Sequence, residues 1–378
     1  MKTGTGIALL SLAIATLERQ QEPAPRRLTA ANLKASAEFM TVSGVREMKS
    51  GQLLVTDGKR PAIYIIDPKT GTATKLGSPG GDSNQYAQPG GVYAGRGDTN
   101  YVLDRGQARI TLVTPAGAIA GIRSIRRNGV SSSSSADVDY QRVDSRGLMY
   151  FTERNGRFAA KLGGLANDSA PLIRFDPLRQ HGDTVAMLRT REMRITSMDE
   201  HSQTSSTVIG SPEDTWGVAP DGRVVVIRAA PYRVDWYSPN GGVTHGPVIA
   251  HTAISFTAAE KAAVASRSSG STSVRGMAGG SSGASTPAPE MPREFAPTKP
   301  PFEPDGEVIV SPEGRVWVAR NLPADVAKTI YDVFDGKGER VDRVELPPRS
   351  RVVGFGPGSI YAAERDDQGA VSLRKYLL

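Results

Sequence analysis

The charged residues with the most chemical potential recur at equivalent points of the sequence, each at the end of a short apolar run. If the elements that carry them surround a common axis, their carboxylates and guanidiniums could grip a polar ligand or a peptide terminus. The alternative, that they form structural ion pairs between neighbouring blades, the repeating units of the chain, stays open. With one aromatic neighbour they make up what we call the predicted ring: Asp57, Asp104, Glu153, Arg154, Trp216, Arg228, Arg320, Glu364 and Arg365.

Catalytic signatures are missing from the 378 residues. The chain has no Cys, which excludes disulfides, Cys-ligated zinc and thiol catalysis. It has four His, of which His245 and His251 are close in sequence, and we do not assign them as metal ligands. A Gly-x-Ser-x-Gly match at 279–283 lies in a low-complexity stretch, without the strand and helix that a nucleophile elbow requires. We therefore predict no catalytic residue, no cofactor and no metal.

A calcium-dependent hydrolase or lactonase is the alternative function. Calcium in a central channel needs several oxygen ligands that converge. The acids available for this are Asp57, Asp104 and Glu153, but Arg228 and Arg320 occupy the equivalent positions later in the chain. Cations there oppose the binding of a divalent metal, so we do not favour this alternative.

The elements that must position these residues are short strands separated by two kinds of tight turn. Glycine is expected in such turns because a positive φ strains most other residues. The first turn recurs before an apolar run at 49–51, 97–98, 145–147, 220–222, 312–314 and 356–358. The second recurs at 67–71, 114–117, 176–177, 238–241 and 335–338.

The repeating unit is about 42–50 residues long, the size of a four-stranded propeller blade. Six units are visible, and the last contains only three strands. The segment 38–42 precedes the first unit and can supply the missing outer strand, which would protect an open edge. We predict an all-β six-bladed β-propeller of four-stranded antiparallel blades, closed by an N-terminal strand.

Several stretches resemble exported bacterial six-bladed β-propellers of the broad NHL/TolB-like group, most of which have no assigned function. The matching stretches are 312–320 (PEGRVWVAR), 331–338 (YDVFDGKG), 351–356 (RVVGFG) and 373–377 (LRKYL). The resemblance extends over about residues 36–378 and implies an exported, periplasmic or secreted protein. It says little about activity, because one fold serves many functions.

Four insertions interrupt the repeat, at 124–138, 155–171, 191–212 and 251–304. By the strand order, all four should lie on one face of the propeller, where binding residues concentrate. In the last insertion, Thr257-Ala258-Ala259-Glu260 is a capping box that predicts a helix over 257–267. A Ser/Gly/Ala-rich stretch (268–290) and a Pro-rich stretch (291–304) follow it.

The N-terminus resembles a secretory signal, with Lys2 before an apolar run at 7–17 that is too short to span a bilayer. We expect a signal and short leader at 1–27, then a single propeller at 28–378 with no further transmembrane segment. The net charge of +7 is diffuse, and no nucleic-acid-binding motif accompanies it. We predict a non-catalytic exported propeller that binds a protein, peptide or cell-envelope polymer through its loop-rich face.

Overall fold

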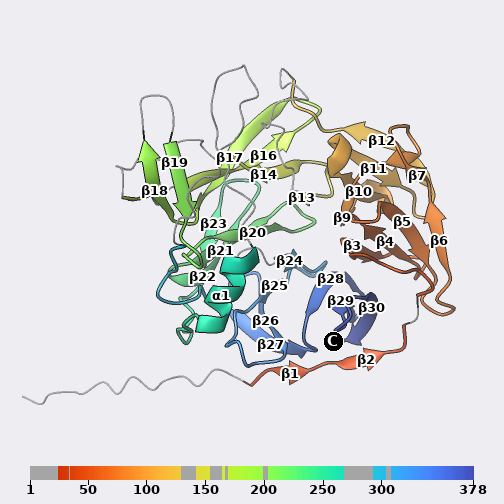
Figure 1. Ribbon diagram of the computed structural model, residues 1–378. Helices are drawn as coiled ribbons and strands as arrows, with labels where there is room; N and C mark the ends of the chain where they lie inside the picture. The colour runs from red at the N-terminus through yellow and green to blue at the C-terminus, as the bar shows by residue number, and fades with distance from the viewer. Residues whose placement is uncertain are drawn as a thin grey trace, which may run out of the picture.

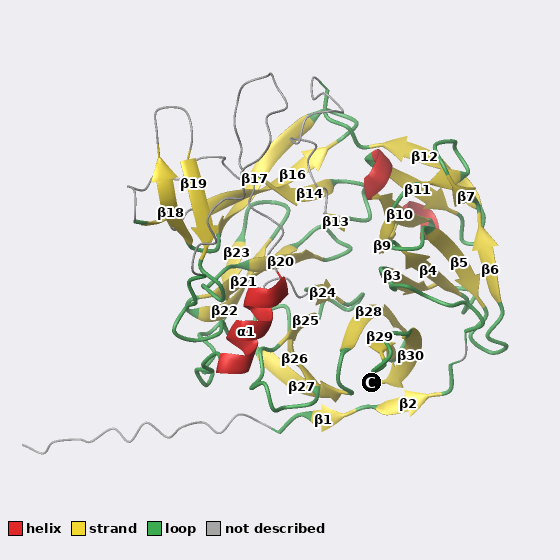
Figure 2. Cartoon of the chain, viewed as in Figure 1, coloured by secondary structure: helices red, strands yellow, loops and turns green. Residues whose placement is uncertain are grey.

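Small antiparallel sheets arranged around a common centre make up most of the described chain (Figure 1). The structure, a computed structural model, describes residues 24–33, 35–128, 142–153, 164–166, 169–198, 203–267, 293–303 and 308–378. Within these ranges the protein is all-β, with a propeller-like arrangement of sheets and one α-helix (Figure 2). The apolar run at 7–17 and the match at 279–283 lie outside the described residues.

Four separate sheets of four or five strands occur in the described ranges. Figure 1 places the first strand of each nearest the centre. One sheet comprises β9 (Pro89–Ala94), β10 (Asn100–Asp104), β11 (Arg109–Val113) and β12 (Ile119–Ser124), with 3₁₀ turns η1 (Arg96–Asp98) and η2 (Arg105–Gln107) between strands. The next comprises β13 (Arg142–Val143), β14 (Met149–Thr152), β16 (Ser169–Asp176) and β17 (His181–Arg189). A third comprises β20 (Thr215–Val218), β21 (Val224–Ala229), β22 (Tyr232–Tyr237) and β23 (Val243–His245). The fourth comprises β24 (Ile309–Val310), β25 (Val316–Ala319), β26 (Thr329–Phe334), β27 (Arg340–Leu346) and β1 (Arg26–Arg27).

The two remaining units of the repeat form one eight-stranded sheet instead of two separate blades. Its strands are, in order, β2 (Thr29–Ala31), β30 (Val371–Leu377), β29 (Ser359–Arg365), β28 (Ser350–Gly356), β3 (Gly44–Glu47), β4 (Leu53–Asp57), β5 (Ala62–Ile66) and β6 (Ala73–Leu76). The two halves join where β28 and β3 pair in parallel, at Gly354 with Val45 and at Phe355 with Arg46. Glycine permits this contact, because a Cβ at Gly354 would lie 2.0 Å from the Val45 carbonyl oxygen. The spacing of turns in the sequence does not indicate this junction.

The predicted turn positions are confirmed by backbone geometry. The first-turn glycines Gly51, Gly97, Gly147, Gly222, Gly314 and Gly358 have φ between 58° and 86°. In the first turn before β21, for example, the Gly222 amide donates to the Ala219 carbonyl at 2.9 Å. A side chain there would be strained, so the recurring glycine marks where each hairpin reverses.

The core lies between sheets. The second strand of a sheet is covered on both faces, and all five residues of β4 are buried. Leu54 and Ile63 of one sheet, for example, pack with Val102 and Val113 of the next in one buried cluster. Burial on both faces explains why these strands are continuous apolar runs instead of alternating ones.

The N-terminal segment differs from the prediction. Residues 38–42 do not form a strand; Phe39 makes a single antiparallel bridge to Val371. The outer edge beside β30 instead carries β2, in antiparallel pairing. β1 pairs in parallel with β27, so Arg26 and Arg27, which we had placed in the leader, belong to a sheet.

Three of the insertions contact one another. β15 (Leu165–Ala166) pairs with β18 (Met193–Met198), which pairs with β19 (Gln203–Thr207). Ile209 then bridges to Phe295 of the last insertion. A further small sheet joins β7 (Ser78–Pro79) and β8 (Gln85–Tyr86).

The helix of the last insertion is confirmed as α1 (Ala258–Arg267). Its capping box is formed: the Glu260 amide donates to Thr257 Oγ1 at 3.2 Å, and the Thr257 amide donates to Glu260 Oε2 at 2.9 Å.

Candidate functional site

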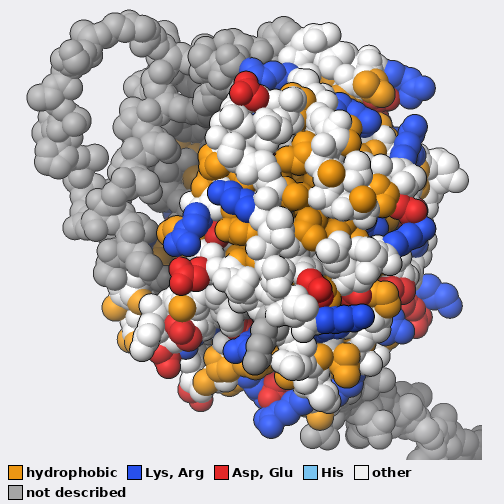
Figure 3. Space-filling model, turned by 90° about the vertical axis from the view of Figure 1, so that its right-hand side faces the viewer, with side chains coloured by type: hydrophobic (Ala, Val, Ile, Leu, Met, Phe, Trp, Pro, Cys, Tyr) orange, Lys and Arg blue, Asp and Glu red, His pale blue; other side chains and the backbone are white. Residues whose placement is uncertain are grey.

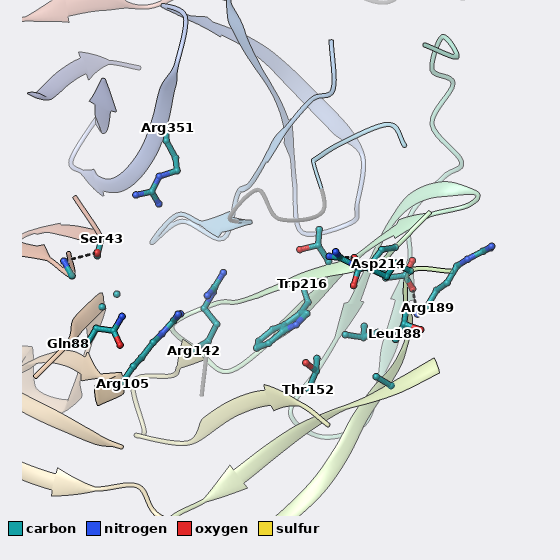
Figure 4. A pocket seen from close by; sticks show the side chains of 18 of the residues that line it. Ser43, Gln88, Arg105, Arg142, Thr152, Leu188, Arg189, Asp214, Trp216 and Arg351 are labelled. Carbon is teal, nitrogen blue, oxygen red and sulfur yellow. Dashed lines mark hydrogen bonds and ion pairs between the residues drawn. The ribbon is translucent and has the colours of Figure 1, made fainter. Parts of the chain in front are cut away.

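A cavity of about 570 Å³ lies where the inner ends of the sheets meet (Figure 4). We call it the central pocket. Its lining comes from different sheets: Ser43 precedes β3, Arg105 follows β10, Arg142 begins β13, Trp216 lies in β20 and Arg351 in β28. The pocket therefore exists only when the sheets are assembled around their centre.

Positive charge dominates the central pocket. Five lining arginines face two lining acids, a formal excess of three positive charges; these residues are Arg105, Arg142, Arg189, Arg191, Arg351, Glu213 and Asp214. In Figure 4 the guanidiniums of Arg105, Arg142 and Arg351 extend into the space between the strands. Guanidiniums bind carboxylate and phosphate through paired hydrogen bonds, so the pocket suits an anionic group.

The outer surface beside β6 and β12 is different. There, lysine, arginine and acidic side chains are scattered among apolar and neutral ones (Figure 3). Scattered charges of both signs give no directed field, whereas clustered charge of one sign in a cavity attracts the opposite sign.

Trp216 forms one wall of the central pocket and is 6% exposed. The Arg142 guanidinium lies over its ring, with Cζ 5.7 Å from the ring centroid. A guanidinium that stacks through its face still presents its N–H groups in the plane. The stacking therefore orients the Arg142 guanidinium at the wall of the pocket.

Ion pairs fix the rim of the central pocket. Arg191 pairs with Glu213 at 2.7 Å and Arg189 with Glu192 at 3.0 Å. Asp214 accepts hydrogen bonds from the backbone amide of Arg189 and from Arg228 Nη1, at 2.9 and 2.7 Å. Burial alone would lower the pKa of Arg228, but its hydrogen bonds to Asp214 and to Asp235, a residue of β22, raise that pKa above the ordinary value.

Trp216 is the member of the predicted ring, among its described members, that lines the central pocket. Asp57 and Asp104 are fully buried and do not line the central pocket. Asp57 accepts the Met40 amide at 2.7 Å, and Asp104 accepts the Gln88 amide at 2.8 Å. Each carboxylate therefore anchors the chain segment that leads into the first strand of its own repeat unit, β3 for Asp57 and β9 for Asp104. This role is structural.

Arg228 and Arg320 form ion pairs within their own sheets. Arg228 pairs with Asp235 at 3.0 Å, and Arg320 pairs with Asp332 at 2.8 Å. Arg320 is 7% exposed and lies over the ring of Tyr232 in the neighbouring sheet. These ion pairs lie within a sheet, whereas the alternative placed them between neighbouring blades.

The remaining members of the predicted ring have separate partners. Exposed Glu153 accepts Arg127 Nη1 at 2.6 Å. Glu364 accepts a hydrogen bond from the Tyr376 hydroxyl, and Arg365 donates to the Gly369 carbonyl at 2.7 Å. Arg154 lies outside the described residues.

The arginines of the central pocket are not among the residues predicted from the sequence. Arg105 directly follows Asp104, while Arg142 and Arg351 lie at the starts of first strands. Position relative to the turns gives only a partial signal. Glu153 and Arg320 also directly follow second strands, but they do not line the central pocket.

The alternative function, a calcium-dependent hydrolase or lactonase, requires several carboxyl oxygens that converge on a central metal site. Among the described residues, no group of three His, Asp or Glu is arranged to hold a metal ion. Asp57 and Asp104, two of the acids considered for that site, already accept backbone amides.

No family model and no curated protein matches the chain. Solved structures that are similar include a member of the DUF4221 family from Bacteroides vulgatus, at 8% identity and a TM-score of 0.49, over 93% of this chain and 97% of that one. Another is a Bacteroides fragilis protein named as a candidate for export, at 11% identity and a TM-score of 0.47, over 93% and 95%. A third is the calcium-binding protein regucalcin from Agrobacterium tumefaciens, at 10% identity and a TM-score of 0.45, over 93% and 95%.

None of the described helices has the length and apolar character required to cross a membrane.

Proposed function

We propose that this protein is a non-catalytic, exported binding propeller whose loop-rich face holds an anionic group of a protein, peptide or envelope polymer in the central pocket. The observation that carries the proposal is the excess of arginine in a cavity built by several sheets. Side chains held by stacking and ion pairs lose little freedom on binding, which favours affinity.

The proposal includes six blades of the NHL/TolB-like kind, with the eight-stranded sheet counted as two. In support, buried clusters combine consecutive units of the repeat, and one combines Val353 and Tyr361 with Val45 and Val55 across the junction of that sheet. β2 at the edge of β30 is the strand that would complete the last blade.

Binding is favoured over calcium-dependent hydrolysis by the charge of the central pocket. Arginines repel a divalent cation, and the two lining acids already pair with Arg191 and Arg228. Export is proposed from the apolar run at 7–17, which precedes the described residues.

The test uses the full chain with citrate as a small polycarboxylate probe, measured by calorimetry and thermal shift. Saturation at about 100 times Kd stabilises the folded protein by about 2.7 kcal/mol, which gives a clear rise in Tm. We expect this rise to disappear when Arg105, Arg142 and Arg351 are replaced together by Gln. Arg179→Gln is the matched control, because Arg179 is exposed and does not line the pocket. An equal rise in the triple variant, or no rise in the natural protein, contradicts the proposal.

A further inference from the structure

A second cavity, of about 250 Å³, adjoins the central pocket and lies between the inner strands of the sheets. Ser43, Gly91 and Arg142 line both cavities. Six strands contribute to the lining of the second cavity: β3, β9, β13, β20, β24 and β28. These are the strands that lie nearest the centre in Figure 1. We call this cavity the axial bore.

The axial bore follows the inner strands away from the central pocket. In β28, Arg351 lines the central pocket, whereas Val353 and Phe355 line the axial bore. In β9, residues 89–90 line only the central pocket and residues 92–94 line only the axial bore. The order of residues along these strands is therefore the order of the two cavities, and a ligand in the central pocket could extend into the bore.

Each of the six inner strands contributes a valine to the axial bore: Val45, Val92, Val143, Val218, Val310 and Val353. Val92, Val218 and Val310 are only partly buried, so some of their apolar surface stays accessible. Among the described residues that line the bore there is no carboxylate. The accessible surface of the bore is mostly apolar, whereas that of the central pocket is mostly polar.

The cations that line the axial bore, Arg46 and Arg142, are held by partners outside it. Arg46 Nη1 donates to Asn100 Oδ1 in the neighbouring sheet. Arg142 lies over the ring of Trp216 and extends into the central pocket (Figure 4). Neither Asn100 nor Trp216 lines the bore. The valines between these two arginines therefore suit an apolar group.

The size of the axial bore suits one part of a ligand. Its volume is below the roughly 300–1,000 Å³ of a site that takes a whole small molecule. Along β9 it is lined over residues 91–94, a length of about 10 Å at about 3.3 Å per residue. An extended chain of about eight carbon atoms, with bonds of about 1.5 Å in a zigzag, has a similar length. The bore therefore favours a hydrocarbon chain over one aliphatic amino-acid side chain.

We infer that the axial bore holds an unbranched hydrocarbon chain attached to the anionic group in the central pocket. The inference rests on the proposed function, which places that anionic group beside the bore. Among the ligands proposed there, it favours an envelope component with a lipid chain over a protein or peptide. The anionic group is a carboxylate or a phosphate, which guanidiniums bind through the same paired hydrogen bonds.

The test measures the Kd of butanoate, hexanoate, octanoate and dodecanoate for the full chain by calorimetry. We expect the Kd to fall about fourfold for each methylene up to octanoate, because each enters apolar surroundings. Dodecanoate should gain little more, because the bore is then filled. Octyl phosphate is measured beside octanoate, and the tighter of the two identifies the anionic group. Octanol, which has no charge, should bind more weakly than that ligand.

Two double variants test whether the chain occupies the axial bore. Val218→Phe with Val310→Phe fills the bore, so octanoate should bind no more tightly than butanoate. Val218→Ala with Val310→Ala removes apolar contacts and should lower the preference for octanoate severalfold. Both variants should bind citrate as the natural protein does, because neither residue lines the central pocket. Val243→Phe with Val341→Phe is the matched control, at exposed valines that line neither cavity.

The outcomes separate this inference from the proposed function. Equal affinity for all four acids while citrate binds overturns this inference alone. An unchanged preference for octanoate in either bore variant does so too, because the chain would then bind elsewhere. If neither citrate nor any of the acids binds, both are overturned.

Discussion

At the scale of single residues, buried carboxylates hold the links between units. Asp104 is fully buried and pairs with Arg109, which is 4% exposed, at 3.1 Å. Asp104→Ala would leave the Arg109 charge buried without its partner, so we expect a loss of about 3–5 kcal/mol of unfolding free energy. Lys49→Ala, which removes an exposed ion pair, should cost less than about 1 kcal/mol. Denaturant unfolding measures both, and equal effects would refute the structural role of Asp104.

Asp235 gives stability a predictable dependence on pH. Burial would raise its pKa, but hydrogen bonds from His245 and Arg228 and the charge of Arg233 lower that pKa below its ordinary value. A lowered folded-state pKa stabilises the protein fully above the unfolded value of about 3.9, and this stabilisation disappears as the pH falls through the folded-state pKa. We expect the Tm advantage over Asp235→Asn to shrink as the pH falls below about 4. An advantage that does not change between pH 7 and pH 3 would contradict this.

At the scale of elements, the close contact between the insertions at 191–212 and 251–304 requires a glycine at position 210. Gly210 has φ 74°, and a Cβ there would lie 2.4 Å from the Phe256 ring. Gly210→Ala should displace Phe256 and increase hydrogen exchange in 254–264 and 293–299. Gly241→Ala is matched for backbone strain, with φ 91° and no atom within 4 Å of the added Cβ. If both variants exchange alike in these segments, strain and not the contact with Phe256 is responsible.

Features formed within one element could be predicted from the sequence, whereas features that need several sheets could not. Turns and the capping box of α1 are local, so glycine spacing and Thr257 with Glu260 were enough to predict them. The central pocket is not local, because Arg105 and Arg351 meet only through the order of sheets around the centre. The predicted ring is ambiguous for a related reason: a charge at a strand end can turn inward to backbone amides, as Asp57 does. Hydropathy patterns do not distinguish the two directions.

At the scale of the whole molecule, the N-terminal segment spans two sheets from outside. β1 covers the edge of β27, β2 covers the edge of β30, and Leu28 between them packs on the buried cluster that those sheets share (Figure 1). Replacing residues 26–31 by a Gly/Ser linker of equal length should uncover both edges and lower the Tm. Uncovered edge strands pair with other chains, so we also expect association that increases with protein concentration.

Arg27→Gln separates strand pairing from charge in this experiment. Arg27 is largely exposed where it pairs with Glu345, so the loss of this ion pair alone should change the Tm little. Light scattering measures the association of the linker variant and of Arg27→Gln, and thermal unfolding measures the Tm of each. If Arg27→Gln reproduces the effect of the linker, the ion pair and not the covered edge holds the segment. If the linker variant stays monomeric with an unchanged Tm, the two sheets are stable without the segment, and their outer edges need no protection.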